Sequence, residues 1–369
     1  MRDLVFSRTY GCTDSILMLP DVYNQTQECA DNHWIVKRDG KIVAGIGNIP
    51  RVINVCGRKI TFEGISGVAT HTREYGKGYM RAIMEAILGH YKETGVMLSY
   101  LTGERRRYQR YGYEKSGNGY DFTFTEKNIK EFKTDPDGPG IELIPIEKED
   151  GLAIEYAKRL HDSDVIHYER SAEKFHTMIS HWFNSPYVAV REGGGYAGFL
   201  IYGKHPNRIC EIHAESPEDF EAMLSAWIKE NGKVSLTLPP WKTAFINKAL
   251  RVCENVTVIN NGHWQVFDWE TVIGAFLDAK ASLARLPDGR LTICVEGYGT
   301  LLMEVSGGVP ICRRASDARP DVTLDSMAAL RFMCGHVNPM YIADIPPHVA
   351  PLVYSWFPLP LFCPHTDAV

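Results

Sequence analysis

GVATHTREYGKGYM, the stretch from Gly67 to Met80, decides the fold of this chain. A β-type apolar run ends at Thr70, a loop with two glycines follows, and an amphipathic helix begins directly after it. The apolar positions of that helix form one stripe made of Met80, Ile83, Met84, Ile87 and Leu88. A helix start entered through Gly76 and Gly78 offers free N–H groups and a positive dipole end, which suits a pyrophosphate. A tight turn without a ligand is the alternative.

The sequence before this loop predicts an antiparallel meander. Three β-rich segments, separated by turn signals at 38–40 and 56–57, cover 33–37, 41–55 and 60–70. After the helix, Gly95 ends the helical pattern, and residues 96–101 form a short apolar run typical of a buried strand. A helix between strands indicates an α/β (α+β) fold, with a first domain over residues 1–135. Residues 134–140 have the composition of a linker.

The middle third repeats the pattern of the first. WIVKRDGKIVAGI at 34–46 aligns without a gap to YVAVREGGGYAGF at 187–199, and a helical stripe follows in both copies. We interpret residues 141–265 as a second copy, although any hairpin can look similar. This copy enters its helix through Glu215 to Asp219, whose carboxylates repel a phosphate, so we expect it to bind no cofactor.

The last third, residues 266–369, predicts a separate domain. A helix is expected over 268–283, strands over 291–295 and 301–305, and a second helix after Asp325 as N-cap. The tail from Pro358 to Val369 cannot be helical, since its prolines hold it extended. It is apolar for a chain end, so we expect it to dock on the protein; a disordered terminus is the alternative.

Composition narrows the function classes. A net charge of −5 disfavours a nucleic-acid partner, which would need clustered Lys and Arg. No apolar run is long enough for a membrane span, and no His/Cys spacing indicates a metal. Nine cysteines at irregular spacings indicate free thiols in a reducing compartment, so we expect a cytoplasmic protein.

The loop from Gly67 to Met80 resembles the acetyl-CoA loop of the GCN5-related N-acetyltransferase (GNAT) superfamily, whose pattern is Arg/Gln-x-x-Gly-x-Gly/Ala. In the usual register Tyr75, Gly78 and Met80 take the three defined positions; Arg73-x-x-Gly76-x-Gly78 also matches, two residues earlier. With the bulky Met80 at the last position of the motif, the loop resembles that of the Eis-like ("enhanced intracellular survival") subfamily, in which a bulky residue commonly replaces the final glycine. This resemblance implies acetyl-CoA as co-substrate and a cofactor site made of Val68, Ala69, Thr70, Gly76, Lys77, Gly78, Tyr79, Met80, Arg81, Gly103 and Glu104.

A second segment, RYQRYGY at 107–113, resembles the family's Tyr-x-Arg-Phe-Gly-Tyr stretch. The resemblance implies that Tyr108 is the general acid, which protonates the departing thiolate. On composition alone Tyr111 and Tyr113 are equal candidates, and only the register of the match selects Tyr108. The cluster Arg105 to Arg107 either holds a CoA phosphate or forms a solvated face.

The Eis-like resemblance extends over the whole chain. It implies tandem GNAT-like domains, the second degenerate, followed by a sterol-carrier-protein-like domain. It also implies that the terminal carboxylate, here that of Val369, reaches the transfer site as general base. If it does not, a water or a side chain such as Glu63 would have to take the proton. A homo-oligomer, with a hexamer as one form, is expected as well.

We therefore predict an N-acetyltransferase that moves the acetyl group of acetyl-CoA to a primary amine by direct attack. The resemblance implies aminoglycoside-like, lysine or other cationic amines as acceptors. The alternative is an apolar-ligand-binding protein that uses the third domain, with a vestigial acetyltransferase fold. The glycine loop and Tyr108 argue against such decay of the first copy.

Overall fold

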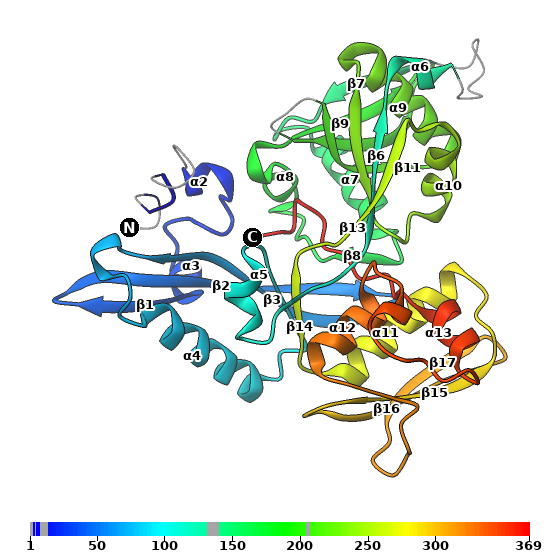
Figure 1. Ribbon diagram of the computed structural model, residues 1–369. Helices are drawn as coiled ribbons and strands as arrows, with labels where there is room; N and C mark the ends of the chain where they lie inside the picture. Colours follow the sequence, from blue (N-terminus) through cyan, green and yellow to red (C-terminus); the bar gives the residue numbers. More distant parts are fainter. Residues whose placement is uncertain (1–2, 4, 8–13, 131–139, 204–206) are drawn as a thin grey trace.

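The computed structural model describes residues 3, 5–7, 14–130, 140–203 and 207–369. Three sheets organise the chain, and each forms the centre of one lobe (Figure 1). The tail passes between the lobes, and its end lies beside strand β3 (Arg58–Thr70). Apart from Gly140, the predicted linker 134–140 lies outside the described residues.

The first sheet begins with the predicted meander. Strands β1 (His33–Arg38), β2 (Lys41–Val55) and β3 pair antiparallel, and β3 then pairs parallel with β4 (Leu98–Leu101). Two-residue turns join the first three strands, and Asp39, Gly40, Cys56 and Gly57 all have positive φ there, as such turns require. The strands predicted from the sequence in this region are confirmed.

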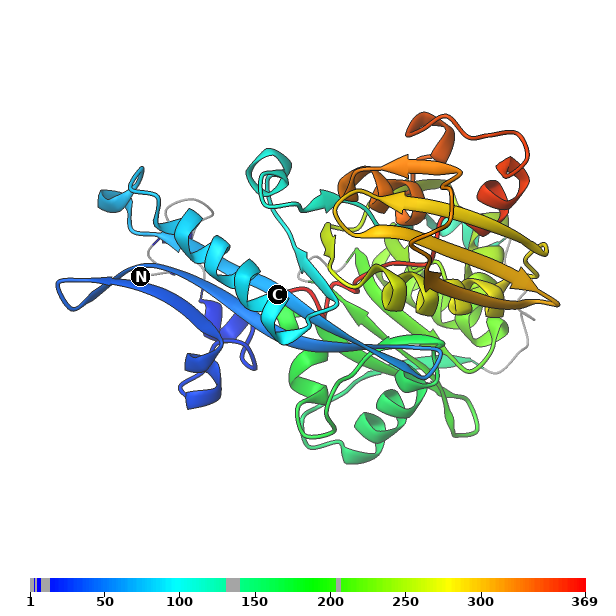
Figure 2. The same ribbon diagram turned by 90° about the horizontal axis from the view of Figure 1, so that it is seen from below.

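Helix α4 (Tyr79–Thr94) covers one face of the first sheet (Figure 2). Ile83, Met84 and Ile87 of its predicted stripe are buried, while Met80 and Leu88 are partly buried at its rim. Each large aliphatic side chain buried in this way contributes about 1.5–3 kcal/mol. The stripe therefore fixes the rotation of α4 about its axis and determines which of its side chains face away from the sheet.

The second sheet repeats the order of the first. Strands β9 (Ser185–Arg191), β10 (Tyr196–Tyr202) and β11 (Arg208–Ala214) pair antiparallel, helix α9 (Pro217–Asn231) follows, and β12 (Val234–Leu238) returns parallel to β11. Strand β7 (Ile141–Pro145) extends the sheet beyond β9. Helices α7 (Gly151–Asp162) and α8 (Phe175–Ile179) share one apolar core with this sheet, and α9 and α10 (Thr243–Val252) share another.

The two sheets exchange a strand. β14 (His263–Val266) lies between β4 and β5 (Glu114–Lys115) in the first sheet, and β6 (Gly119–Phe124) lies between β12 and β13 (Asn255–Ile259) in the second. The sequence boundaries 1–135 and 141–265 therefore do not separate the two sheets. Short apolar strands fit either sheet equally well, and only packing such as that of Trp264 on Tyr100, with ring centroids 4.7 Å apart, decides between them.

The third lobe carries a four-stranded sheet in the order β17-β16-β15-β18. Its strands are β15 (Gly289–Val295), β16 (Gly299–Ser306), β17 (Val309–Arg314) and β18 (Val322–Leu324). Three helices accompany it: α11 (Trp269–Leu283), α12 (Ser326–Cys334) and α13 (Ala350–Trp356). Asp268 and Asp325 cap α11 and α12, so both predicted helices are confirmed.

The tail, residues 358–369, docks as predicted. Leu359, Leu361, Phe362 and Cys363 belong to the apolar core shared by the first sheet and the third lobe. Side chains of both halves hold its backbone: the Asn118 amide donates to the carbonyl of Leu359, and the Asn261 amide donates to that of Cys363. The tail thus reaches the first sheet along a fixed path.

Candidate functional site

A β-bulge marks the end of β3. Gly45 pairs with Ala69 and Gly47 pairs with Ser66, so that Gly67 and Val68 together face the single Ile46. Gly67 has a φ of +56°, in the left-handed region that favours glycine. The bulge bends β3 locally and interrupts its ladder, which frees main-chain groups near Val68 for a ligand.

Strands β3 and β4 part directly beyond their short pairing. They are joined only from Phe62 to Gly64 on β3, and β4 ends at Leu101 while β3 continues to Thr70. A cavity of about 950 Å³ lies where they diverge. This volume is in the range of small-molecule and cofactor sites.

The glycine loop forms the entrance to α4. Gly78 is the N-cap with a φ of +82° and offers no side-chain hydrogen bond, and the first turn of α4 contains no acidic residue. The N–H groups of this turn therefore face the cavity without a carboxylate of their own helix, which favours an anion at that end. Lys77 adds a cation, although its Nζ lies 2.7 Å from Glu74.

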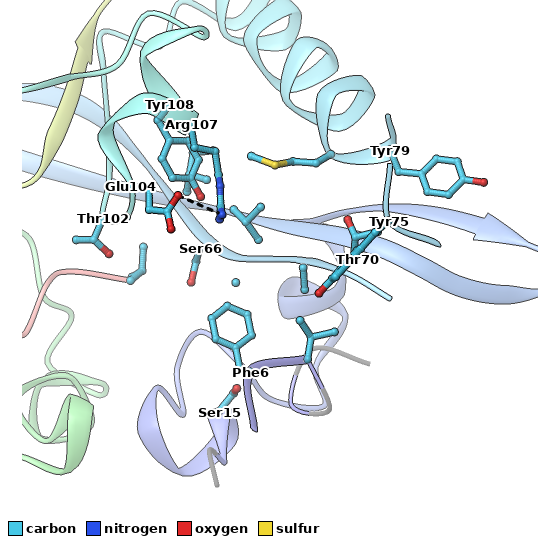
Figure 3. A pocket seen from close by; sticks show the side chains of 18 of the residues that line it. Phe6, Ser15, Ser66, Thr70, Tyr75, Tyr79, Thr102, Glu104, Arg107 and Tyr108 are labelled. Carbon is cyan, nitrogen blue, oxygen red and sulfur yellow. Dashed lines mark ion pairs between the residues drawn. The ribbon is translucent and has the colours of Figure 1, made fainter. Parts of the chain in front are cut away.

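The cavity collects all but one of the site residues predicted from the sequence (Figure 3). From β3, the loop and the start of α4 come Val68, Ala69, Thr70, Gly76, Lys77, Gly78, Tyr79 and Met80. From the segment after β4 come Gly103, Glu104 and Tyr108, and the tail contributes Val369. Arg81 is the exception: it is exposed on α4 and does not line the cavity.

Tyr108 is buried on helix α5 (Arg105–Gln109) and borders the cavity. Its ring lies against Gly103, where a Cβ would approach ring carbon Cε2 to 2.7 Å, so a side chain at 103 would displace it. On another side is His263 of the exchanged strand β14, with ring centroids 6.3 Å apart. Burial lowers the pKa of His263, so this neighbour is neutral at pH 7. A side chain from the second half of the chain, His263, thus packs beside the residue predicted to be the acid.

Two members of the cluster Arg105 to Arg107 have different roles: Arg105 forms a structural ion pair, and Arg107 lines the cavity. Arg105 forms a bidentate pair with the buried Glu114, at 2.7 and 2.8 Å. Burial raises the pKa of Glu114, but hydrogen bonds from Arg105 and Gln109 outweigh this effect and leave the pKa below its ordinary value. Arg107 instead lines the cavity and pairs loosely with Glu104 at 3.5 Å. Arg107 is therefore the member of the cluster that can meet a ligand.

Val369 lies at the inner wall of the cavity and is only 6% exposed. It packs so closely on Gly64 that a Cβ there would collide with its side chain. Its neighbours are fixed as well: the Trp182 indole donates to the Ala368 carbonyl at 3.0 Å, and a ring nitrogen of His181 lies 2.8 Å from the Thr366 carbonyl.

A buried ion network anchors the tail just before its end. Arg170 donates to both carboxylate oxygens of Asp367, at 3.0 and 2.6 Å, and to those of Glu211 at 3.3 and 2.9 Å. The guanidinium is fully buried, so loss of one partner would leave a charge without compensation in the interior. The end of the tail therefore has little freedom to move.

Glu63, the substitute base considered from the sequence, does not line the cavity. Burial raises its pKa to about 7, against the lowering effect of a hydrogen bond with Asn48. Nearby, Ser99 donates to the Glu63 carbonyl and bonds the Tyr113 hydroxyl. Glu63 and Tyr113 thus belong to a polar cluster inside the sheet, and neither borders the cavity.

Several lining residues could not be selected from the sequence. Ser66 and Gly67 line the cavity because of the bulge, and Gly67 was the only feature of the sequence that could have indicated this bulge. The others come from the N-terminal segment, including helix α2 (Ser15–Met18), and from the second copy, and they are Val5, Phe6, Ser15, Met18, Leu19, Tyr23 and Trp182. No periodicity or motif connects these positions with the glycine loop.

The corresponding helix start in the second copy is already occupied. The Ser216 hydroxyl caps α9 by accepting from the N–H of Asp219, and the Asp219 carboxylate pairs with Arg191 at 3.0 and 2.8 Å. A carboxylate of the helix itself therefore stands where α4 offers free N–H groups. Among the described residues, no group of three or more His, Cys, Asp or Glu side chains is arranged to hold a metal.

Comparison with known protein families gives one match. Residues 9–116 match the family model "Acetyltransferase (GNAT) domain". No curated protein sequence matches the chain.

Solved structures match almost the whole chain at low identity. A GCN5-related N-acetyltransferase from Kribbella flavida is 16% identical with a TM-score of 0.65, covering 98% of this chain and 95% of its own. A probable N-acyltransferase from Enterococcus faecalis is 14% identical with a TM-score of 0.65, covering 92% and 91%. Eis1 from Mycobacterium abscessus is 12% identical with a TM-score of 0.62, covering 93% and 92%.

The match over residues 9–116 identifies a GNAT acetyltransferase domain in the N-terminal third, which supports an acyltransferase enzyme. The solved structures show that the fold is shared over almost the whole chain. Within the part of the chain that the structure describes, no helix has the length and apolarity to cross a bilayer. The alternative, an apolar-ligand-binding protein with a vestigial acetyltransferase fold, is not favoured.

Proposed function

We propose that acetyl-CoA binds in the cavity between β3 and β4 and that its acetyl group passes directly to a primary amine. The observation that carries this proposal is the convergence of the bulge, the glycine loop and Tyr108 on one cavity. Main-chain groups of Val68 and Thr70 would hold the pantetheine and polarise the acetyl carbonyl. The N-terminus of α4 would receive the pyrophosphate.

The proton transfers follow from the positions of two groups. The amine must be neutral to attack the thioester, and the terminal carboxylate of Val369 would accept its proton. The hydroxyl of Tyr108 would then donate a proton to the departing CoA thiolate. Both residues line the same cavity, which is compatible with direct attack without an acyl-enzyme.

We also propose the finer assignments of the sequence analysis: an Eis-like acetyltransferase, a third lobe related to sterol-carrier proteins, and a homo-oligomer. The likeness to Eis1 over the whole chain supports the first two. Eight free cysteines in the described residues support a reducing compartment such as the cytoplasm.

Calorimetric titration with acetyl-CoA tests the proposed site. We expect one molecule bound per chain, because α4 offers an open helix start whereas Asp219 fills that of α9. A stoichiometry of two equivalent sites per chain would contradict the assignment.

A further inference from the structure

We propose that the acceptor is a monoamine with an apolar or aromatic body, and that acceptors with a second ammonium group are poor substrates. This inference rests on the proposed function and narrows the broad class of cationic amines. It follows from what the cavity presents on the side opposite to Tyr108, where Phe6 and Ser15 face Tyr108 and Arg107 across the open space (Figure 3).

An apolar cluster forms this part of the wall. Leu19, Tyr23 and Val369 are at most 6% exposed, and they pack with Val22 and Ile49 of the same cluster and with Trp182 at its edge. The polar atoms of the two aromatic residues are already paired: the Tyr23 hydroxyl bonds Ser66, another lining residue, at 2.5 Å, and the Trp182 indole N–H donates to the Ala368 carbonyl. Apart from this hydroxyl pair and the terminal carboxylate, the cluster presents ring and aliphatic surface, which favours an apolar ligand body.

The backbone that delivers Trp182 is strained. Trp182 and Phe183 have φ values of +61° and +59°, a conformation that L-residues with large side chains rarely adopt. Two such residues in succession persist only where the surroundings hold them, and strain of this kind concentrates at functional sites. Here His181 fixes the segment through its contacts with Asp21 and with the Thr366 carbonyl. The strained backbone thus positions the Trp182 indole beside the end of the tail.

The charged side chains of the described lining are already paired. Glu74 contacts Lys77 at 2.7 Å and Arg38 at 3.3 Å, and Glu104 contacts Arg107 at 3.5 Å. The reacting amine is neutral when it attacks, so it needs no permanent counter-ion. The proposed function assigns the remaining carboxylate, at the terminus of Val369, to the reacting amine. A second ammonium group would therefore either compete with a basic side chain for Glu74 or Glu104 or lose its hydration against apolar surface.

Helix α2 offers a site to test this assignment. Met18 lines the cavity, whereas Leu17, the preceding residue, is 64% exposed and does not. Met18→Glu would place a carboxylate on the acceptor wall, and Leu17→Glu would add the same charge outside it. The two variants carry the same charge and differ by one position in the helix.

The experiment compares hexylamine with hexamethylenediamine, which has the same six-carbon chain and carries a second amine on the terminal carbon. Initial rates of CoA thiol release give kcat/KM for each. We expect the wild type to prefer hexylamine by at least about 10-fold, since such group differences in an apolar pocket are worth about 10–200-fold. Met18→Glu should reduce this ratio, and Leu17→Glu should leave it unchanged.

The outcomes separate this inference from the proposed function. Equal or better use of the diamine by the wild type would overturn the monoamine class while leaving acetyl transfer intact. An unchanged ratio in a folded Met18→Glu protein would overturn the placement of the acceptor beside α2. If the protein binds acetyl-CoA but consumes neither these amines nor any other, the proposed function itself fails. The wild-type ratio alone decides the class if Met18→Glu does not fold.

Discussion

At the scale of single residues, two glycines have the same backbone conformation and different surroundings. Gly78 and Gly57 both have a φ of +82°, and a Cβ on either would meet nothing within 4 Å. Gly57 lies in the turn between β2 and β3, whereas Gly78 caps α4 and lines the cavity. Any difference between substitutions at these two positions therefore reports on the cavity and not on backbone strain.

We expect Gly78→Glu to reduce acetyl-CoA binding below detection, because the substitution places bulk and negative charge where the pyrophosphate must approach. Gly57→Glu carries the same charge and the same strain, of about 1 kcal/mol, away from the cavity. It should lose similar stability and keep its affinity. Calorimetry with acetyl-CoA and thermal unfolding of both variants check this; equal loss of affinity in both would count against the assigned loop.

The residues around Gly78 were predictable because the loop and the helical stripe lie next to each other in the sequence. Trp182 was not predictable, since it lies about a hundred residues beyond the loop and reaches the cavity only through a strained turn. Arg81 was assigned by its position in the motif and proved to lie outside the lining, because the rotation of α4 is set by the buried stripe.

At the scale of elements, the order of strands and helices followed from the sequence, but their partners did not. Alternating and apolar runs predicted β1 to β4 and α4 with small errors at the ends. The exchange of β6 and β14 left no trace in the sequence, since strands of six and four residues carry too little pattern to specify their partners. That exchange matters to the site, because β14 carries His263 to Tyr108.

The tail is an element whose length can be changed without changing its anchors. One glycine added after Val369 would displace the terminal carboxylate by about 3.3–3.6 Å. Arg170 would still hold Asp367, so the upstream path should remain. Since misplacement by about 1 Å can cost on the order of 10²-fold, we expect turnover to fall by at least that factor.

Ala368→Gly is the matched control for this extension, because it introduces a glycine beside Val369 without changing the length of the tail. Steady-state kinetics of both proteins check the prediction. Full activity of the extended protein would rule out the terminal carboxylate as the base and would point to water.

At the scale of the whole molecule, buried histidines couple stability to pH. His161 is buried on α7; burial, helped by the charge of Arg170, lowers its pKa from 6.5 to about 3. Burial and the charge of Lys242 also lower the pKa of His213, whose ring centroid is 5.7 Å from that of His161. Between these pH values the unfolded chain binds protons that the folded protein does not, so the free energy of unfolding falls as pH falls from about 6.5.

We therefore expect the free energy of unfolding, measured by urea denaturation, to decrease steadily from pH 6.5 to pH 4, by up to about 1.4 kcal/mol per pH unit for each such histidine. His161→Gln removes one titrating group, so its stability should fall less steeply while His213 still titrates. Unfolding curves across this pH range check the effect. An identical slope in His161→Gln would show that His161 does not contribute.

We propose that acetyl transfer occurs in the cavity between β3 and β4, with Tyr108 as the acid. The most direct test is amine-dependent release of CoA thiol by Tyr108→Phe, which keeps the aromatic ring and removes the hydroxyl. The control is Tyr111→Phe in the same segment, since Tyr111 does not line the cavity. We predict that turnover of Tyr108→Phe falls by roughly 10²–10⁴ with acetyl-CoA affinity little changed, and that Tyr111→Phe retains its turnover. Wild-type turnover in Tyr108→Phe would contradict the claim.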